Sequence, residues 1–422
     1  GLMFFIVTVP MERLVMWLIS LISPRLTYFA NRNVKRGQTR NTLISMLVLF
    51  SGVLPSFLAT QTALENANVE NNLRQNLGAA LDIRVAVWGR TEEELARQRL
   101  KPAFLSSELA AIPGVEQAAG MTFEYETGIR DEIGFKRAGV RVQGVEGPLE
   151  EVIFLDMVDF AAGSPQEAFA QLRADPAAVI ISDGLAQHLA VPLGGTVKLQ
   201  GEGLDHEVVA RVAGIARRIP GMGGIGRSRL EAQNGSVVLI SREGFRRLRT
   251  ELNQPLPPDD EPVLERVKAS LAAEADKEEM ASLMSDVFRE EYDLWFRFLE
   301  LDLERIIASQ ASQQIFLLVL TAISFTTAVF GVFAVIYVTV YSRRIEIGMM
   351  KAMGMKRHQL TGMLVIEAIV MTLGAALAGI AAGAAMGYVT YYSERILAQD
   401  HVNFAVDTTV IPFIVIMVVL AS

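Results

Sequence analysis

Long runs without charge constrain this chain more than any other feature. Three such runs carry no charge or a single one, and they are Asn41–Leu64, Ile315–Tyr341 and Met363–Tyr392. Each reaches the roughly 20 residues that a helix needs to cross the hydrocarbon core of a bilayer. A fourth apolar run, Val410–Leu420, begins another span near the end of the sequence. We therefore expect an α-helical membrane protein.

The N-terminal apolar stretch is interrupted by Pro10, Glu12 and Arg13. A charge at the bilayer centre costs about 2.5–3.5 kcal/mol on insertion scales, so a single span is unfavourable here. We expect residues 1–10 to be the tail of a preceding transmembrane helix, and Met11–Ile22 to be an interfacial amphipathic helix. Both ends of the sequence look cut inside helices, which favours a segment of a longer polypeptide.

The basic residues sort to one side of the expected membrane. Residues 25–40 hold Arg25, Arg32, Lys35, Arg36 and Arg40 with no acid, and residues 343–358 are similarly basic. Because short basic loops stay in the cytoplasm, the linker within 11–40 and the segment 343–360 are predicted to be cytoplasmic. The run 31–40 is read either as ordinary anchoring or as a surface helix that touches a cytoplasmic partner.

This sidedness divides the chain. The predicted parts are a transmembrane helix (41–64), an extracytoplasmic α+β domain (65–308), a transmembrane helix with a stalk (309–342), the cytoplasmic segment (343–360), a transmembrane helix (361–392), an outer loop (393–408) and the start of a last transmembrane helix (409–422). Residues 63–308 hold 41 acidic and 27 basic residues, a net charge of −14. An acidic outer domain does not bind polyanions, so no nucleic acid partner is expected.

The outer domain mixes strand and helix patterns. Alternation and β-branched residues predict strands at 82–89, 121–127, 139–144, 179–182, 196–200, 207–215 and 236–240. Helices are predicted at 104–112, 184–189, 242–252, 263–270 and 274–283. Phe288–Gln314 reads as one amphipathic helix that continues to Tyr341 as a single rod.

Residues for catalysis or metal binding are not found at suitable spacings. The four histidines, His188, His206, His358 and His401, share no ligand-like spacing, and there is no cysteine. The glycine-rich GMGGIG at 221–226 lacks the Lys-Ser/Thr of a phosphate-binding loop and is read as a mobile outer loop. We predict a non-catalytic chain that binds no cofactor and no metal, with a structural role for Glu367.

Small residues recur at four-residue spacing in the span 361–392, at Ala375, Gly379, Gly383 and Gly387. They form one flat stripe on a helix and allow another backbone to approach closely. The stripe predicts tight helix packing.

With these residues placed, the chain resembles the FtsX/MacB-like permeases of ABC transporters (type VII). FANRNVKRGQTRNTLISMLVLFSGV (29–53) is similar to the family's entry to its first span, and the matching positions are Ala30, Arg32, Asn33, Arg36, Arg40 and Thr42. RRIEIGMMKAMGMKRHQL (343–360) is similar to its R-x-x-E-I-G-x-l-k-A-l-G-a segment. Pieces at 112–117, 179–199, 209–215 and 237–248 resemble its extracytoplasmic core domain, which has two subdomains.

The resemblance implies that 343–360 is a coupling helix that docks on a cytoplasmic ABC ATPase dimer, where ATP-Mg is bound. The implied ATPase-coupling residues are Arg343, Arg344, Glu346, Ile347, Gly348, Lys351, Ala352, Gly354 and Lys356. It also implies mechanotransmission, membrane lipids as surroundings, and a second permease module in the same chain or a second permease copy. The expected location is the bacterial cytoplasmic (inner) membrane, crossed several times.

Several functions remain open. The leading hypothesis is export or extraction of an amphipathic substrate, such as a lipid, lipoprotein or peptide. The alternative is a regulator that activates an extracytoplasmic cell-wall hydrolase or sensor partner without transport. A receptor is disfavoured by the four predicted spans, and an enzymatic outer domain by the lack of a catalytic constellation.

Overall fold

The computed structural model describes residues 2–22, 38–85, 100–201, 206–223, 225, 234–252, 263–288, 292, 294–398 and 402–405. The chain divides into two compact units. Unit 1 comprises Gly1–Asn68, Ala308–Ser393 and Val402–Ser422, and unit 2 comprises Val69–Ile307 and Glu394–His401. The predicted basic linker at 23–37 and the predicted last span at 409–422 lie outside the described residues.

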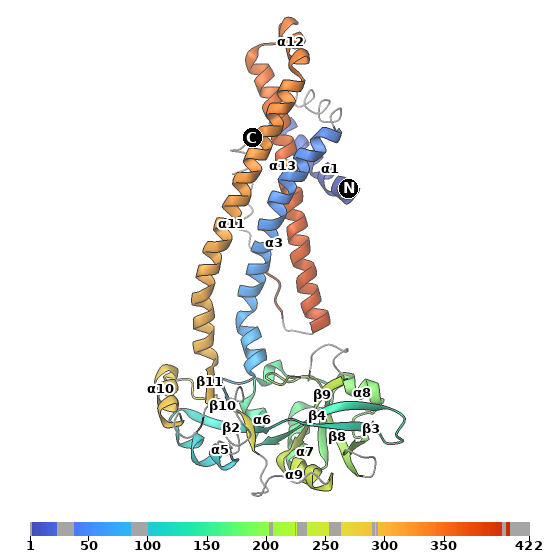
Figure 1. Cartoon of the computed structure of the whole chain (residues 1–422), viewed down its shortest axis with the longest axis vertical. Coiled ribbons are helices and arrows are strands. Elements are labelled where there is room, and N and C mark those ends of the chain that lie inside the picture. Colours follow the sequence, from blue (N-terminus) through green and yellow to red (C-terminus); the bar gives the residue numbers. More distant parts are fainter. Residues whose placement is uncertain are drawn as a thin grey trace. The chain divides into compact units, whose positions relative to one another are not determined.

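The described part of unit 1 is mostly helical (Figure 1). Its helices are α1 (Leu2–Ile22), α3 (Gln38–Leu77), α11 (Leu299–Ser342), α12 (Arg344–Ala352) and α13 (Arg357–Ser393), and α3 and α11 also give residues to unit 2. A five-residue π-helix, Glu394–Ala398, follows α13. In the described part of the chain, only Arg357–Ile396 is both long and apolar enough to cross a membrane. The other predicted spans stay predictions.

The N-terminal helix is longer than the sequence suggested. We expected a break near Pro10, but α1 continues through this residue from Leu2 to Ile22. Proline removes one backbone donor and crowds the preceding turn, which kinks a helix without always ending it. The helix therefore has no break at Pro10, and the division of residues 1–22 into a span tail and an interfacial helix stays a prediction.

Unit 2 is built on one eleven-stranded sheet. The strands are β1 (Leu81–Val85), β2 (Val115–Thr122), β3 (Tyr125–Asp131), β4 (Arg137–Glu146), β5 (Asp159–Ala162), β6 (Ala178–Ser182), β7 (Thr196–Gln200), β8 (Glu207–Arg218), β9 (Asn234–Ser241), β10 (Leu264–Leu271) and β11 (Leu294–Phe298). Their order is β11-β1-β10-β2-β4-β3-β7-β8-β6-β9, with β5 beside β8. The α+β class expected of the outer domain is confirmed.

Six of these strands form a closed ring, because β9 at the end of the series also pairs with β4 in parallel. Every ring strand contributes apolar side chains to one core, including Ile129, Val142, Ile181, Leu199, Val212 and Val238. Helices α8 (Asp183–Leu189) and α9 (Arg242–Glu251) begin directly after β6 and β9. The serine that ends each strand caps the helix, since Ser182 Oγ accepts from Leu185 N and Ser241 Oγ accepts from Gly244 N.

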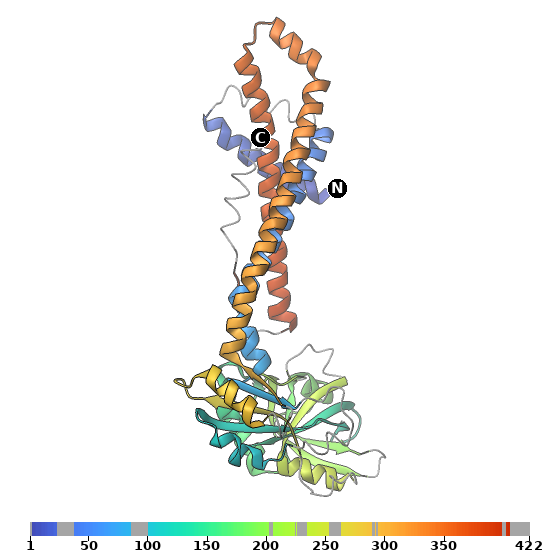
Figure 2. The same cartoon turned by 60° about the vertical axis from the view of Figure 1, so that its left-hand side comes forward.

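Of the other five strands, β5 lies beside β8, and β2-β10-β1-β11 form an open limb of the sheet. Leu81 and Ile83 of β1 and Val267 and Ala269 of β10 face a core that is closed by α5 (Ala103–Ser107), the 3₁₀ turn η1 (Leu109–Ala111) and α10 (Lys277–Phe288). Figure 2 shows this limb from another side. A third core lies under α6 (Leu149–Val152), the 3₁₀ turn η2 (Leu155–Met157) and α7 (Pro165–Ala174).

Two predictions for this limb are wrong. Val263–Ser270, read as a helix, is strand β10, and Phe288–Gln314, read as one helix, contains β11 before α11 begins at Leu299. In the structure Lys268 of β10 is fully buried, and its hydrogen-bond partners are Asp82 of β1 and the carbonyl oxygen of Leu77 at the end of α3.

Gly78, which follows α3, generates a stability prediction. Its φ is +79°, and an added Cβ would meet Pro220 C at 2.7 Å and Gly221 Cα at 2.8 Å. A left-handed conformation costs a non-glycine residue about 1–2 kcal/mol, and the backbone contacts add to this. We expect Gly78→Ala to lower the free energy of unfolding by more than about 2 kcal/mol, measured by thermal unfolding of the full chain in detergent.

The matched control is Gly194→Ala, because Gly194 also has a positive φ (+77°) but an added Cβ would meet nothing within 4 Å. It isolates the conformational cost of about 1 kcal/mol. Equal losses for the two variants would contradict the crowding at Gly78.

Candidate functional site

The segment predicted to couple to an ATPase folds as a short helix and a turn. Helix α12 ends at Ala352, and Gly354 follows it with φ +96°. Gly354 N donates to Lys351 O and Met355 N donates to Met350 O, at 3.0 and 3.1 Å. An added Cβ on Gly354 would meet nothing, so the glycine serves the left-handed turn. The helix predicted over 343–360 is therefore two helices with a sharp turn between them.

The surface of α12 is open along its length, since none of its side chains is buried. Ile345, Met349 and Met353 are 72%, 55% and 80% exposed, and their four-residue spacing puts them on one side. Among the predicted coupling residues, seven are exposed and Ile347 is half-buried; the exposed ones are Arg344, Glu346, Gly348, Lys351, Ala352, Gly354 and Lys356. The segment thus presents an apolar stripe flanked by charges.

Arg343 differs from the other predicted coupling residues because it faces α13. Its Nη1 lies 3.1 Å from Glu367 Oε1 and 3.2 Å from Oε2, and its Nε lies 3.3 Å from Glu346 Oε2. The side chains of Arg343 and Glu367 are 14% and 4% exposed. This pair ties the start of α12 to α13, which gives Glu367 the structural partner that sequence reasoning did not identify.

The small-residue stripe of α13 lies against α3. An added Cβ on Gly383 would meet Phe57 N at 2.7 Å, and one on Gly387 would meet Thr60 Cβ at 3.0 Å. Ser56 Oγ donates to Ile380 O at 3.1 Å between the same helices. Ala375 and Gly379 are also buried. Backbones approach closely at these positions because no side chain intervenes.

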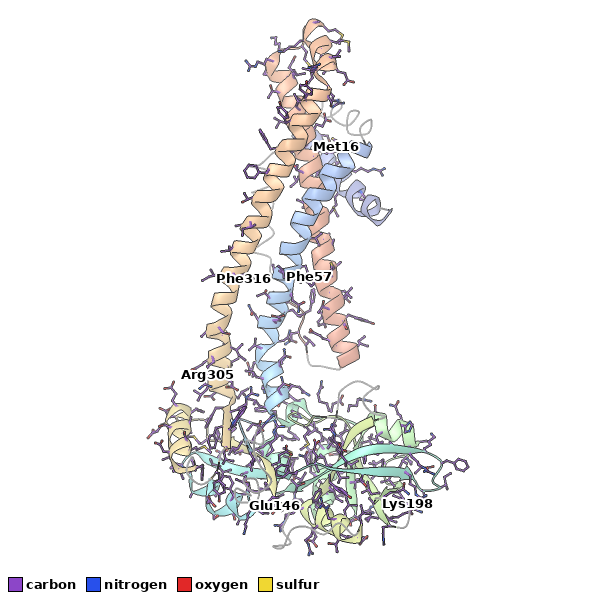
Figure 3. The ribbon with its side chains drawn as sticks, viewed as in Figure 1. Met16, Phe57, Glu146, Lys198, Arg305 and Phe316 are labelled. Carbon is purple, nitrogen blue, oxygen red and sulfur yellow. The ribbon has the colours of Figure 1, made fainter. Side chains whose placement is uncertain are left out.

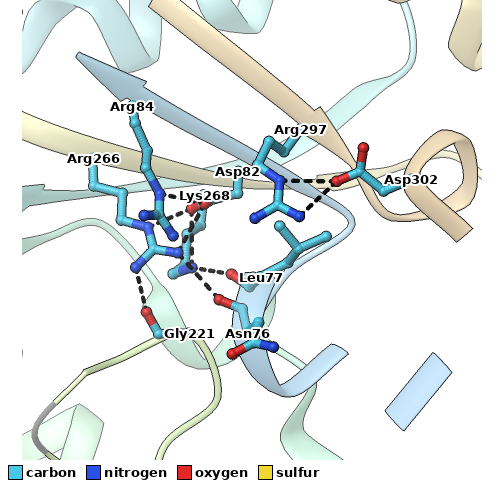
Figure 4. A network of polar contacts seen from close by, with 9 residues as sticks. All are labelled: Asn76, Leu77, Asp82, Arg84, Gly221, Arg266, Lys268, Arg297 and Asp302. Atoms are coloured by element: carbon cyan, nitrogen blue, oxygen red, sulfur yellow. Dashed lines mark hydrogen bonds and ion pairs between the residues drawn. The ribbon is translucent and has the colours of Figure 1, made fainter. Parts of the chain in front are cut away.

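A buried cluster of charges in unit 2 was not predicted (Figure 4). Asp82 of β1 accepts from Arg84 Nε at 2.9 Å, from Arg266 Nε at 2.5 Å and from Lys268 Nζ at 3.2 Å. The Asp82 and Lys268 side chains are both 0% exposed. They are cross-strand neighbours, as are Arg84 and Arg266, in the register of β1 with β10. The four side chains share the face of the limb opposite its apolar core.

The pKa values of the two fully buried residues, Asp82 and Lys268, are both lowered, but by different causes. Burial lowers the pKa of Lys268 to about 7, although Asp82 favours its charged form. Burial by itself would raise the pKa of Asp82, but Lys268, Arg266 and Arg84 outweigh it, so the pKa lies below its usual value. The cluster therefore keeps a carboxylate ionised inside the protein.

The glycine-rich stretch at 221–226 contributes to this cluster rather than forming a mobile outer loop. Gly221 O accepts from Arg266 Nη1 at 2.6 Å, and Gly221 N donates to Gln75 O at 2.7 Å. Met222 and Ile225 are 7% and 2% exposed. The prediction was wrong for the described residues 221–223 and 225, because backbone contacts to distant elements are invisible in local composition.

Comparisons with known proteins follow the same division of the chain. A family model described as the MacB-like periplasmic core domain matches residues 42–287, and one described as the FtsX-like permease C-terminal domain matches residues 318–422. No curated protein matches the chain.

Two solved structures are similar to part of the chain. The periplasmic region of MacB from Actinobacillus actinomycetemcomitans is 11% identical with a TM-score of 0.37, and covers 56% of this chain and 95% of that one. The extracellular domain of the noncanonic ABC-type transporter YknZ from Gram-positive bacteria is 16% identical with a TM-score of 0.33, and covers 51% and 98%. The family assignment rests on the two family models.

The Arg343–Glu367 pair predicts a charge-exchange effect. Arg343→Ala leaves the buried Glu367 carboxylate without this guanidinium, so we expect a loss of about 3 kcal/mol in stability. The exchange Arg343→Glu with Glu367→Arg is expected to recover much of it. Thermal unfolding of the full chain in detergent measures both, with the exposed Arg344→Ala as control. Equal losses for the single change and the exchange would argue against the pair.

Lys268 predicts a pH dependence of stability. Its folded pKa of about 7 lies below the ordinary value of 10.5, so between these values the unfolded chain binds a proton that the folded chain has released. Stability contributed by this group therefore rises with pH across this window, by at most about 1.4 kcal/mol per pH unit. We expect Lys268→Met to flatten the rise in thermal unfolding between pH 7 and 10. Identical pH profiles in the two proteins would show that Lys268 does not titrate there.

Proposed function

Since this chain belongs to the FtsX/MacB-like permeases of ABC transporters, we propose that it is the membrane subunit through which a separate cytoplasmic ATPase moves the outer domain. The family consists of permeases whose ATPase is generally a separate subunit. ATP-Mg would bind to that partner and not to this chain.

The observation that carries this proposal is the exposed stripe on α12. Ile345 and Met349 lie on α12, a helix without a buried side chain between two long helices, and Met353 is the residue that caps its end. An apolar stripe rimmed by charges is suited to a groove on a protein partner, with charged groups at the edge of the contact. We assign this surface to the ATPase.

The work done by the ATPase would be delivered to unit 2. α3 and α11 both contribute residues to units 1 and 2, so a displacement of these helices would reach the sheet. The substrate we propose is amphipathic, such as a lipid, lipoprotein or peptide, which is exported or extracted at the outer side of the membrane.

The proposed setting is the bacterial cytoplasmic membrane, crossed several times, with lipid or a second permease module around the helices. In support, large exposed apolar side chains occur along α11: Phe316, which is labelled in Figure 3, is 66% exposed, and Phe330 and Phe333 are each 70% exposed. Large apolar side chains of this kind are stable in contact with acyl chains or another helix.

A regulatory function is favoured by one observation on unit 2. Ile133 and Phe135, in the turn between β3 and β4, are 77% and 87% exposed. Gly134 N donates to Asp131 O at 3.1 Å and Lys136 N donates to Asp131 Oδ1 at 2.9 Å, so the turn is held in one shape. Two fixed apolar side chains fit a protein partner outside the membrane, as an activated hydrolase or sensor requires.

The docking proposal predicts the effect of a single charge on the stripe. Met349→Asp is expected to abolish co-purification of the ATPase with the full chain, because a carboxylate would be desolvated in an apolar contact. Leu283→Asp is the matched control, since Leu283 is also helical and 39% exposed but belongs to unit 2. Affinity purification followed by ATPase assay measures both.

The two variants test whether the ATPase docks on α12. Loss of the ATPase with Met349→Asp and its retention with Leu283→Asp support docking on α12. Retention of the ATPase by a chain that lacks residues 343–358 would sink the proposal.

A further inference from the structure

The two helices shared by the units enter the sheet at neighbouring strands. α3 ends at Leu77 and β1 begins at Leu81, while β11 ends at Phe298 and α11 begins at Leu299. Leu81 and Phe298 are paired across the two strands, and Leu299 N donates to Ala80 O at 2.9 Å. The end of α3 and the beginning of α11 are therefore attached to one antiparallel pair of strands.

The carbonyl oxygens of the last turn of α3 accept hydrogen bonds mainly from residues outside the helix. The final four carbonyl oxygens of a helix have no partner within it. Here Gly78 N donates to Arg74 O at 2.8 Å, Gly221 N to Gln75 O at 2.7 Å, Arg266 Nη2 to Asn76 O at 3.3 Å, and Lys268 Nζ to Leu77 O. Three of these four donors belong to residues more than 100 positions away in the sequence.

Asp82 holds the two cationic donors in place. Its carboxylate binds Arg266 at 2.5 and 2.8 Å and Lys268 at 3.2 Å, so both cations are fixed on β10 facing the end of α3 (Figure 4). Cations near the C-terminus of a helix also complement its dipole. The arrangement joins β1, β10 and the helix end through one charged group.

Stability alone does not explain this cluster. Burying a charged pair costs desolvation energy, and an apolar pair of similar volume is often as stable or more so. The charged side chains add directional hydrogen bonds, because Arg266 and Lys268 each donate to one carbonyl oxygen of the last turn of α3. An apolar pair would hold the strands together but would let the helix end slide.

We propose that Asp82, Arg266 and Lys268 are positioning residues of a rigid joint, which passes displacement of α3 to β1 and through β11 to α11. The proposal rests on the proposed function, because that function supplies the displacement. It assigns the cluster to the coupling of ATP use to movement of the outer domain, and not to binding of a substrate.

Lys268→Met is the sharpest variant. Asp82 keeps the guanidinium groups of Arg266 and Arg84, so no buried charge loses all its partners, while Leu77 O loses its cationic donor. Arg297→Met is the matched control, because Arg297 lies opposite Asp82 in register on β11 but pairs with Asp302 at 2.8 Å. Arg266→Lys is the second variant if Lys268→Met does not fold.

The chain contains no cysteine, so two introduced cysteines carry spin labels without background. We would label Asn72→Cys on α3 and Ser282→Cys on α10, which packs on the limb; both are exposed positions of unit 2, and the full chain would be studied in lipid nanodiscs. Pulsed electron resonance then measures the distribution of distances between the labels, without nucleotide and with the co-purified ATPase and ATP.

The expected result is a narrow distribution in the unaltered protein and in Arg297→Met, unchanged by ATP. In Lys268→Met we expect a broad distribution, with and without ATP, and unchanged binding of the ATPase. A distribution as narrow in Lys268→Met and Arg266→Lys as in the unaltered protein would overturn the joint. If the unaltered chain binds no ATPase, the proposed function fails, whereas the nucleotide-free distances still decide the joint.

Discussion

The ionised carboxylate of Asp82, held by the side chains of Arg84, Arg266 and Lys268, is the interaction on which the arrangement of unit 2 depends. A charge without solvent must be matched on every side, which fixes the positions of its partners more strictly than apolar packing does. Here the partners come from two strands, and two of them also bond the last turn of α3. Strand pairing, helix termination and the glycine-rich turn at Gly221 are consequently determined together.

The sequence was informative where a pattern is local. Uncharged runs located the long helices, a short apolar run located strand β6, and the motif at 343–360 identified the family that the family models then matched. The sequence was misleading at β10, which was predicted to be a helix and which holds Arg266 and Lys268. Their partner Asp82 lies 184 and 186 residues away, and no local window contains it. Arg343 shows the same limit on a shorter scale, because its place in a motif did not reveal its contact with Glu367.

The family models leave residues 288–317 unmatched, between the core domain and the permease domain. This interval contains β11 and the first turns of α11, which attach to the strand that follows α3. The connection between the two matched regions is therefore made by hydrogen bonding between strands as well as by chain continuity. The Arg297–Asp302 pair lies within this interval and joins β11 to the first turns of α11.

The closed ring of strands has a mechanical consequence. A strand in a ring cannot change register unless its neighbours change too, so β3, β4, β6, β7, β8 and β9 are bound to turn as one piece. The open limb meets this piece at β2 and β4, which share only the pairs Gly120–Glu146 and Met121–Val145. By contrast, β4 and β9 are paired along seven positions of each strand. Torsion applied to the limb will concentrate at the two-pair contact between β2 and β4, which is therefore where the sheet bends most easily.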